Sequence, residues 1–143
     1  MTRTAGYGQS FAMKHLNEGR LEEALAETDK AIALDAEDPE PVLERAQVLL
    51  AMNRYEEAVA AIERTLRLDQ VARIVDDMAV DDTLFSALVG WGQELAKSDV
   101  AAAVALLGRY REIFPQGIHH DEALEWGRRF RGQVETWVKA RAE

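Results

Sequence analysis

Apolar residues recur along most of the chain at the three- and four-residue spacing of a single helix face, with polar residues between them. Ala, Leu, Glu and Arg, which favour helices, dominate the composition, and no run of Val, Ile or Thr alternates long enough to predict a strand. The pattern therefore predicts an all-α fold. The expected helices lie near residues 5–17, 21–35, 40–51, 55–69, 82–97, 99–113 and 120–141.

Short breaks separate these helices. Asn17–Arg20 and Met52–Arg54 are polar turns, and Phe114–Gly117 is typical of a helix end. Asp38 before Pro39 and the pair Ser98–Asp99 are typical of helix starts, because a capping side chain precedes the first turn. Since each break is only a few residues long, consecutive helices are expected to be antiparallel neighbours.

The segment 19–35 (GRLEEALAETDKAIALD) is repeated 34 residues later at 53–69 (NRYEEAVAAIERTLRLD), with identity at seven of 17 positions. This length of helix–turn–helix unit resembles the tetratricopeptide repeat family. The resemblance implies that Ala24 and Ala58 are small because two helices cross closely there. The chain departs from the family pattern after each Leu-Asp pair, where Ala36 and Gln70 replace the usual proline.

A weaker repeat follows downstream, because Trp91-Gly92 recurs as Trp126-Gly127 35 residues later. The resemblance thus implies a single solenoid domain over 1–143, with repeats at about 5–38, 39–70 and 82–115, a helical insertion at 70–82 and a capping helix at 119–141. The capping helix is expected to cover the apolar face of the last repeat. Its apolar stripe consists of Ala123, Trp126, Phe130, Val134 and Trp137.

Composition and charge argue against several classes of function. Lys and Arg number 17 against 26 Asp and Glu, which gives a net charge of −9 and argues against nucleic-acid binding. No apolar run is long enough for a membrane helix, and the N-terminus lacks the apolar core of a signal peptide. The absence of cysteine excludes disulfides and thiolate chemistry. We therefore expect a cytoplasmic protein that binds neither nucleic acid nor membrane.

Candidate chemistry is sparse. His119 and His120 could suggest a metal site, but adjacent helical residues point about 100° apart and do not converge. The pairs Glu22–Glu23 and Glu56–Glu57 occupy matching repeat positions, which indicates architecture rather than acid–base catalysis. The sequence therefore predicts no enzyme activity, no metal and no cofactor.

Two charged segments have alternative interpretations. The acidic residues of the insertion form either a solvated connector with an N-cap aspartate or a docking element. The arginines of the last two helices form either a solvated face paired with Glu112 and Glu125, or a docking site for an acidic partner, or a contact with the acidic insertion. The two sets are Asp76, Asp77, Asp81 and Asp82, and Arg109, Arg111, Arg128, Arg129 and Arg131.

The family resemblance implies a scaffold or adaptor that binds a peptide or helix of another protein on the concave surface of the first helix of each repeat. The residues placed there are Gln9, Met13, Leu16, Leu43, Gln47, Leu50, Val89 and Gln93. For Leu43 and Leu50, packing against neighbouring helices is the alternative. A secretion-type substrate chaperone and a self-associating structural protein, which would form a homo-oligomer, are the alternative functions.

Overall fold

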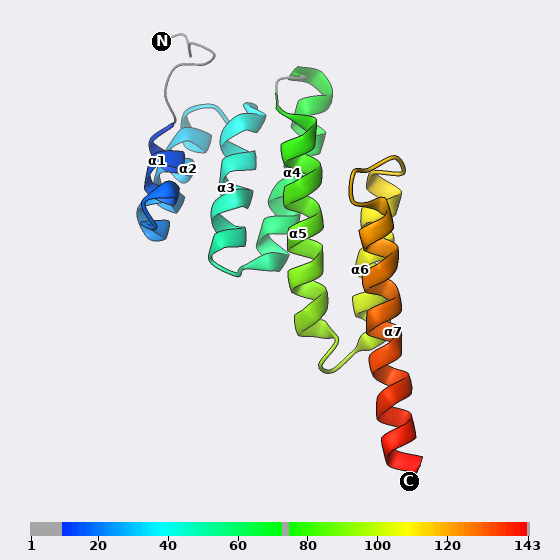
Figure 1. Cartoon of the computed structure of the whole chain (residues 1–143). Coiled ribbons are helices and arrows are strands. Elements are labelled where there is room, and N and C mark those ends of the chain that lie inside the picture. Colours follow the sequence, from blue (N-terminus) through cyan, green and yellow to red (C-terminus); the bar gives the residue numbers. More distant parts are fainter. Residues whose placement is uncertain (1–9, 73–74, 143) are drawn as a thin grey trace.

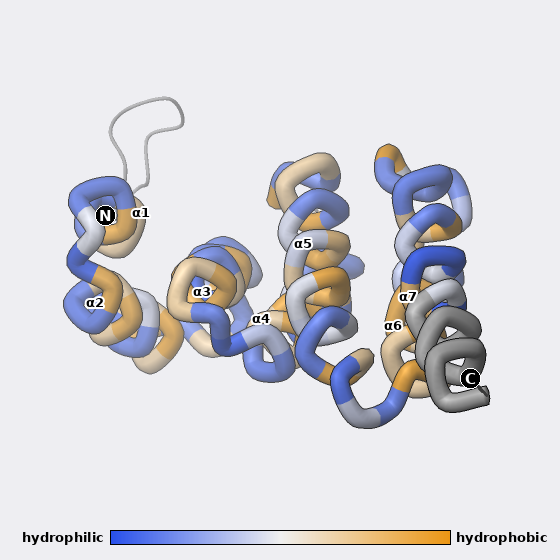
Figure 2. Tube along the Cα trace, turned by 60° about the horizontal axis from the view of Figure 1, so that its bottom comes forward, coloured by the Kyte–Doolittle hydropathy of each residue, from blue (hydrophilic) through white to orange (hydrophobic). Residues whose placement is uncertain are grey.

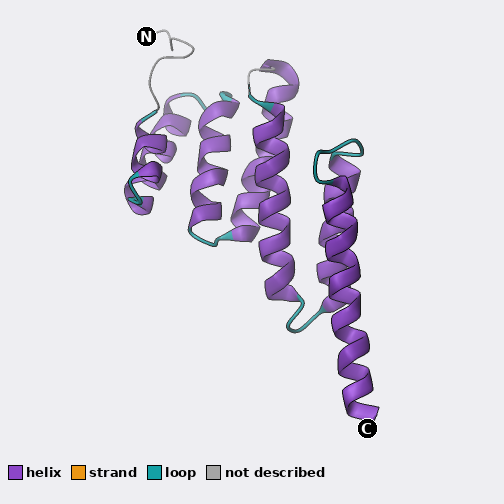
Figure 3. Cartoon of the chain, in the orientation of Figure 1, coloured by secondary structure: helices purple, strands orange, loops and turns teal. Residues whose placement is uncertain are grey.

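The computed structural model describes the backbone of residues 10–72 and 75–142 and the side chains of residues 10–70 and 75–132. Every regular element of this part of the chain is a helix (Figure 3). The helices are α1 (Phe11–Asn17), α2 (Leu21–Leu34), α3 (Pro39–Ala51), α4 (Tyr55–Ala72), α5 (Asp77–Leu95), α6 (Val100–Ile113) and α7 (His120–Ala142). The predicted all-α fold is confirmed.

The helices pack as sequential antiparallel hairpins, α1 with α2, α3 with α4 and α5 with α6, and α7 packs on α6 (Figure 1). The first helices of the hairpins also contact one another, α1 with α3 and α3 with α5. The lower part of α7 extends past the turn between α5 and α6 (Figure 1). Hydrophobic and hydrophilic segments alternate around each helix, as amphipathic packing requires (Figure 2).

Capping residues and turns explain where the helices begin and end. The side chains of Asp38 and Asp99 accept hydrogen bonds from the first turns of α3 and α6, as predicted. Gly19 and Asn53 have φ angles of 76° and 59° in the turns of the first two hairpins. They are equivalent residues of the repeat, and glycine and asparagine tolerate this left-handed conformation better than other residues do. Sequence and backbone therefore repeat together.

The small residues of the repeat lie in the core. Ala24 and Ala58 are fully buried, which confirms the close helix crossings expected at these positions. Gly90 likewise allows the second and third hairpins to pack closely, because a Cβ atom there would lie 2.3 Å from the ring of Tyr55. The five helices from α3 to α7 contribute the largest buried side chains, which include Leu49, Ile62, Leu84, Leu88, Tyr110 and Phe130.

Two predicted helix starts differ from the structure. The first described helix begins at Phe11, and residues 5–9 of its predicted range lie outside the described residues. The fifth helix begins at Asp77 rather than at 82, because Asp76 caps it by accepting hydrogen bonds from the backbone of Met78 and Ala79. The predicted insertion at 70–82 thus includes the end of α4 and the first six residues of α5. The division of the chain into repeats stays a prediction.

Candidate functional site

The surface formed by α1, α3 and α5, here called the first-helix surface, is where the family resemblance places partner binding. The hydroxyl of Ser10, which caps α1, donates a hydrogen bond of 2.9 Å to Glu44 Oε2 on α3. This bond fixes the two first helices side by side. It also engages Glu44, a carboxylate that would repel the carboxylate of a peptide C-terminus.

The predicted binding residues differ in their exposure. Gln9 lies outside the described residues. On α1 and α3, Met13, Leu16 and Gln47 are half-buried, and Gln93 on α5 is exposed. These four side chains are therefore accessible to a partner.

The other three predicted residues take part in packing. Leu43 is only 8% exposed and belongs to the core. Leu50 and Val89 are half-buried and pack against the core with part of their surface. Packing in the core thus describes Leu43 better than partner binding does. Leu50 and Val89 leave part of their apolar side chains exposed to solvent.

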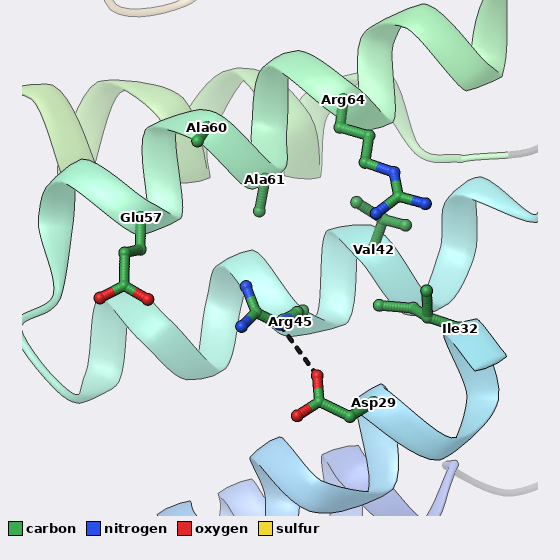
Figure 4. A pocket seen from close by; sticks show the side chains of 8 residues that line it. All are labelled: Asp29, Ile32, Val42, Arg45, Glu57, Ala60, Ala61 and Arg64. Atoms are coloured by element: carbon green, nitrogen blue, oxygen red, sulfur yellow. Dashed lines mark hydrogen bonds and ion pairs between the residues drawn. The ribbon is translucent and has the colours of Figure 1, made fainter. Parts of the chain in front are cut away.

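A groove lined by residues of α2, α3 and α4, here called the second-helix groove, lies apart from the first-helix surface (Figure 4). It encloses about 340 Å³ and is lined by Asp29, Ile32, Val42, Arg45, Glu57, Ala60, Ala61 and Arg64. Arg45 donates to Asp29 at 3.0 Å, and Arg64 donates to the Ala36 carbonyl at 3.4 Å. The Arg54 guanidinium beside Glu57 holds the pKa of that carboxyl below its usual value. Arg45 thus joins α3 to α2, and Arg64 joins α4 to the turn after α2, whereas the pair of Arg54 and Glu57 lies at the start of α4.

The start of α5 meets the turn between α6 and α7 through a buried network. Asp81 is 5% exposed, and its Oδ1 accepts a hydrogen bond of 2.5 Å from the Tyr110 hydroxyl. Its Oδ2 accepts from the Ile118 backbone at 3.1 Å, and the His119 backbone donates to the Tyr110 oxygen at 2.9 Å. Burial and the bond to Asp81 raise the pKa of Tyr110. The hydroxyl therefore stays protonated and donates to Asp81.

His119 extends this network toward solvent. Its ring stacks on Phe85 at a centroid distance of 4.3 Å, and its nitrogens lie 2.8 Å from Asp82 and 2.8 Å from Glu122. Burial lowers the pKa of His119, but the hydrogen bonds to Glu122 and Asp82 outweigh burial and raise the pKa above its ordinary value. The physical reason is that only the imidazolium form donates to both carboxylates.

This arrangement predicts a pH dependence. Because the folded-state pKa of His119 is raised, its stabilising contribution is complete below the unfolded pKa of 6.5 and disappears as the pH rises through the folded value. The loss of unfolding free energy caused by His119→Gln should therefore be larger at about pH 6 than at about pH 8.5. Urea unfolding of both proteins at both pH values measures it. Since His15 and His120 are present in both proteins, an equal loss at the two pH values would contradict the assignment.

The hairpin geometry and the 34-residue register agree with the family comparison. A family model described as tetratricopeptide repeat matches residues 15–76. Residues 15–76 are thus similar to tetratricopeptide repeats. The crystal structure of MamA is also similar, with 15% sequence identity, coverage of 93% of this chain and 99% of that chain, and a TM-score of 0.42. No curated protein matches the chain.

Tetratricopeptide repeats are generally modules for protein–protein interaction. Across the ranges with described side chains, no group of three or more His, Asp or Glu residues could hold a metal ion. His119 is engaged by Asp82 and Glu122, and Nδ1 of His120 is buried without a hydrogen-bond partner. None of the helices, as far as they are described, combines the length and apolarity needed to cross a membrane.

The arginines beyond the matched segment are partly paired. Arg109 pairs with Glu63 on α4, and Arg128 and Arg129 lie 3.6 Å and 3.7 Å from Glu125. Arg129 also lies over the Trp126 ring, 4.8 Å from its centroid. The contacts with Glu125 fit the interpretation of a solvated face.

The network of Asp81, Tyr110 and His119 was not predicted from the sequence. Asp81 was expected to belong to the acidic insertion, as part of either a solvated connector or a docking element. One signal was available, because Asp81 precedes Phe85 by four residues and Leu88 by seven and so shares their apolar face. A carboxyl on such a face requires a hydrogen-bonding partner.

Proposed function

We propose that the chain is a cytoplasmic adaptor that binds an apolar peptide or helix of another protein on the first-helix surface. The observation that carries the proposal is the row of accessible apolar and amide side chains on adjacent first helices. Met13 and Leu16 lie on α1, Gln47 and Leu50 on α3, and Val89 on α5. Apolar side chains of the partner would supply most of the binding free energy, and the glutamine amide would hydrogen-bond its backbone.

The charge of the surface restricts the partner. Glu44 lies among these residues, where Ser10 holds it by a hydrogen bond. A free C-terminal carboxylate is disfavoured there because the two negative charges repel each other. An internal apolar segment of a partner protein meets no such repulsion. This property separates the proposal from a carboxylate clamp, which needs cationic side chains at these positions.

The double variant Met13→Glu/Gln47→Glu tests the proposal. We expect it to weaken the binding of a library-selected peptide by about tenfold or more, because charges would enter a desolvated apolar contact. The peptide is selected from a random library on the immobilised wild-type chain, and its affinity is measured by fluorescence anisotropy. Neither residue belongs to the main core cluster, so the melting temperature should change little.

The matched control is Ala26→Glu/Ala105→Glu, which adds the same charge at exposed positions of the second helices α2 and α6. It should bind the peptide as tightly as the wild type. Equal affinity for all three proteins would refute the proposed surface. Light scattering at several concentrations distinguishes the self-association alternative, which the exposure of Phe11 and Leu34 at 72% and 88% favours.

A further inference from the structure

A second apolar surface lies at the opposite end of α5 from its contact with Tyr55, where α6 ends and the turn to α7 begins. We call it the tip groove. It encloses about 460 Å³ and is lined by Asp77, Met78, Asp81, Ile113, Phe114, Pro115, Gln116, Gly117 and Ile118. Its volume is sufficient for a bulky side chain.

The tip groove has an unusual concentration of exposed apolar surface. Of the four exposed large hydrophobic side chains in the described part of the chain, two line this groove, Met78 at 64% and Ile118 at 55%. Ile113 and Phe114 are half-buried beside them. Burying these side chains against a partner would be favourable, because apolar surface is removed from water.

The groove is also negatively charged. Its lining contains two carboxyl groups and no Lys, Arg or His. Both oxygens of Asp81 accept hydrogen bonds, from Tyr110 and Ile118, whereas the exposed carboxylate of Asp77 makes no hydrogen bond or ion pair with any described residue. The C-terminal end of α6 adds partial negative charge, and the Asp76 cap already occupies the positive end of α5.

The floor of the groove is fixed before any partner arrives. The bonds from Tyr110 and Ile118 to Asp81 tie α5 to α6 and to the following turn. A Cβ atom at Gly117 would lie 2.3 Å from the Tyr110 hydroxyl, so the turn packs closely on the network. A preorganised surface loses little conformational entropy on binding.

We infer that the tip groove binds a partner segment in which a bulky apolar side chain is flanked by Lys or Arg. The apolar side chain packs on Met78 and Ile118, and the cation pairs with Asp77. The occupant is a different protein rather than a second copy, because a chain with a net charge of −9 repels its own copies. This site is separate from the first-helix surface and does not depend on it.

The test uses a labelled synthetic peptide that alternates arginine with leucine and phenylalanine, and a matched peptide with serine at the apolar positions. We expect the apolar peptide to bind at least about tenfold more tightly than the serine peptide. The variant Met78→Gln/Ile118→Gln should abolish this preference. Equal affinity of the wild type for both peptides would show non-specific attraction to an acidic protein and would overturn the inference.

Matched variants separate the two contributions. Asp77→Asn should weaken binding by about threefold to tenfold and reduce its salt dependence. Glu22→Gln, which removes an exposed carboxylate from the first turn of α2, and Leu34→Gln, which removes an exposed leucine, should have no effect. Met13→Glu/Gln47→Glu should also bind normally. Equal losses in the controls, or self-association that depends on Met78 and Ile118, would contradict the assignment.

Discussion

Asp81→Ala is expected to lower the free energy of unfolding by about 2–4 kcal/mol, more than most single surface substitutions do. The substitution leaves the Tyr110 hydroxyl and the Ile118 backbone N–H without an acceptor. Tyr110 is fully buried, so water cannot replace the lost partner unless the turn between α6 and α7 opens. The cost therefore comes from unpaired polar groups, not from lost apolar contact.

Urea unfolding of Asp81→Ala, Tyr110→Phe and the double variant measures this coupling. The double variant should lose less stability than the sum of the single losses, because it no longer contains the unpaired hydroxyl. Asp77→Ala is the control, since Asp77 is an exposed carboxylate in the first turn of the same helix and should cost about 1 kcal/mol or less. An effect of Asp81→Ala no larger than that of Asp77→Ala would show that the network is unimportant for stability.

Deletion of residues 119–143 is expected to abolish cooperative unfolding or to cause aggregation. The deletion removes α7, which packs along α6 and buries Ala123 and Phe130. The Phe130 ring lies within about van der Waals distance of the position where a Gly92 Cβ would stand, so α7 also covers α5. Without it, the apolar side of the last hairpin would face water, as happens to a repeat array without its cap.

Thermal melting followed by circular dichroism, together with size-exclusion chromatography, measures the deletion. Phe130→Ala keeps the helix and should lose about 3–5 kcal/mol of stability. Arg128→Ala, on the exposed side of the same helix, should change it by about 0.5 kcal/mol or less. A truncated chain that stays monomeric and melts as sharply as the wild type would contradict the capping role. The side chains of Val134 and Trp137, which belong to the predicted apolar stripe, lie outside the described residues.

The sequence predicted the helices well because their signals are local. Helical periodicity, the caps at Asp38 and Asp99 and the turns at Gly19 and Asn53 depend on residues close to one another in the chain. The start of α5 was predicted five residues late for a related reason. Its first six residues contain three further aspartates after the Asp76 cap, and such a run resembles a solvated connector when its partners are unknown.

The network around Asp81 depends on distant residues and could not be predicted in this way. Tyr110 and Ile118 lie 29 and 37 residues further along the chain, and only the packing of α5, α6 and the following turn brings them together. The tip groove arises from the same packing. The exposure of Met78 and Ile118 is likewise a tertiary property, because the helical spacing of Met78 alone suggests a core position.

Leu43 shows the corresponding difficulty for the first-helix surface. Helical register places it on α3 with Gln47 and Leu50, but the register does not specify how closely the neighbouring helices cover each residue. The structure buries Leu43 and leaves Met13, Gln47 and Gln93 accessible. The proposed site is therefore best represented by its accessible members.

Backbone amide chemical-shift mapping tests the first-helix surface most directly. The isotope-labelled chain is titrated with the library-selected peptide, and each shifted amide is placed on the structure. We predict the largest shifts on α1, on α3 and in the middle of α5, with Met13, Gln47 and Val89 among them. Shifts confined to α2 and α4 along the second-helix groove, or to the tip groove, would contradict the proposed function.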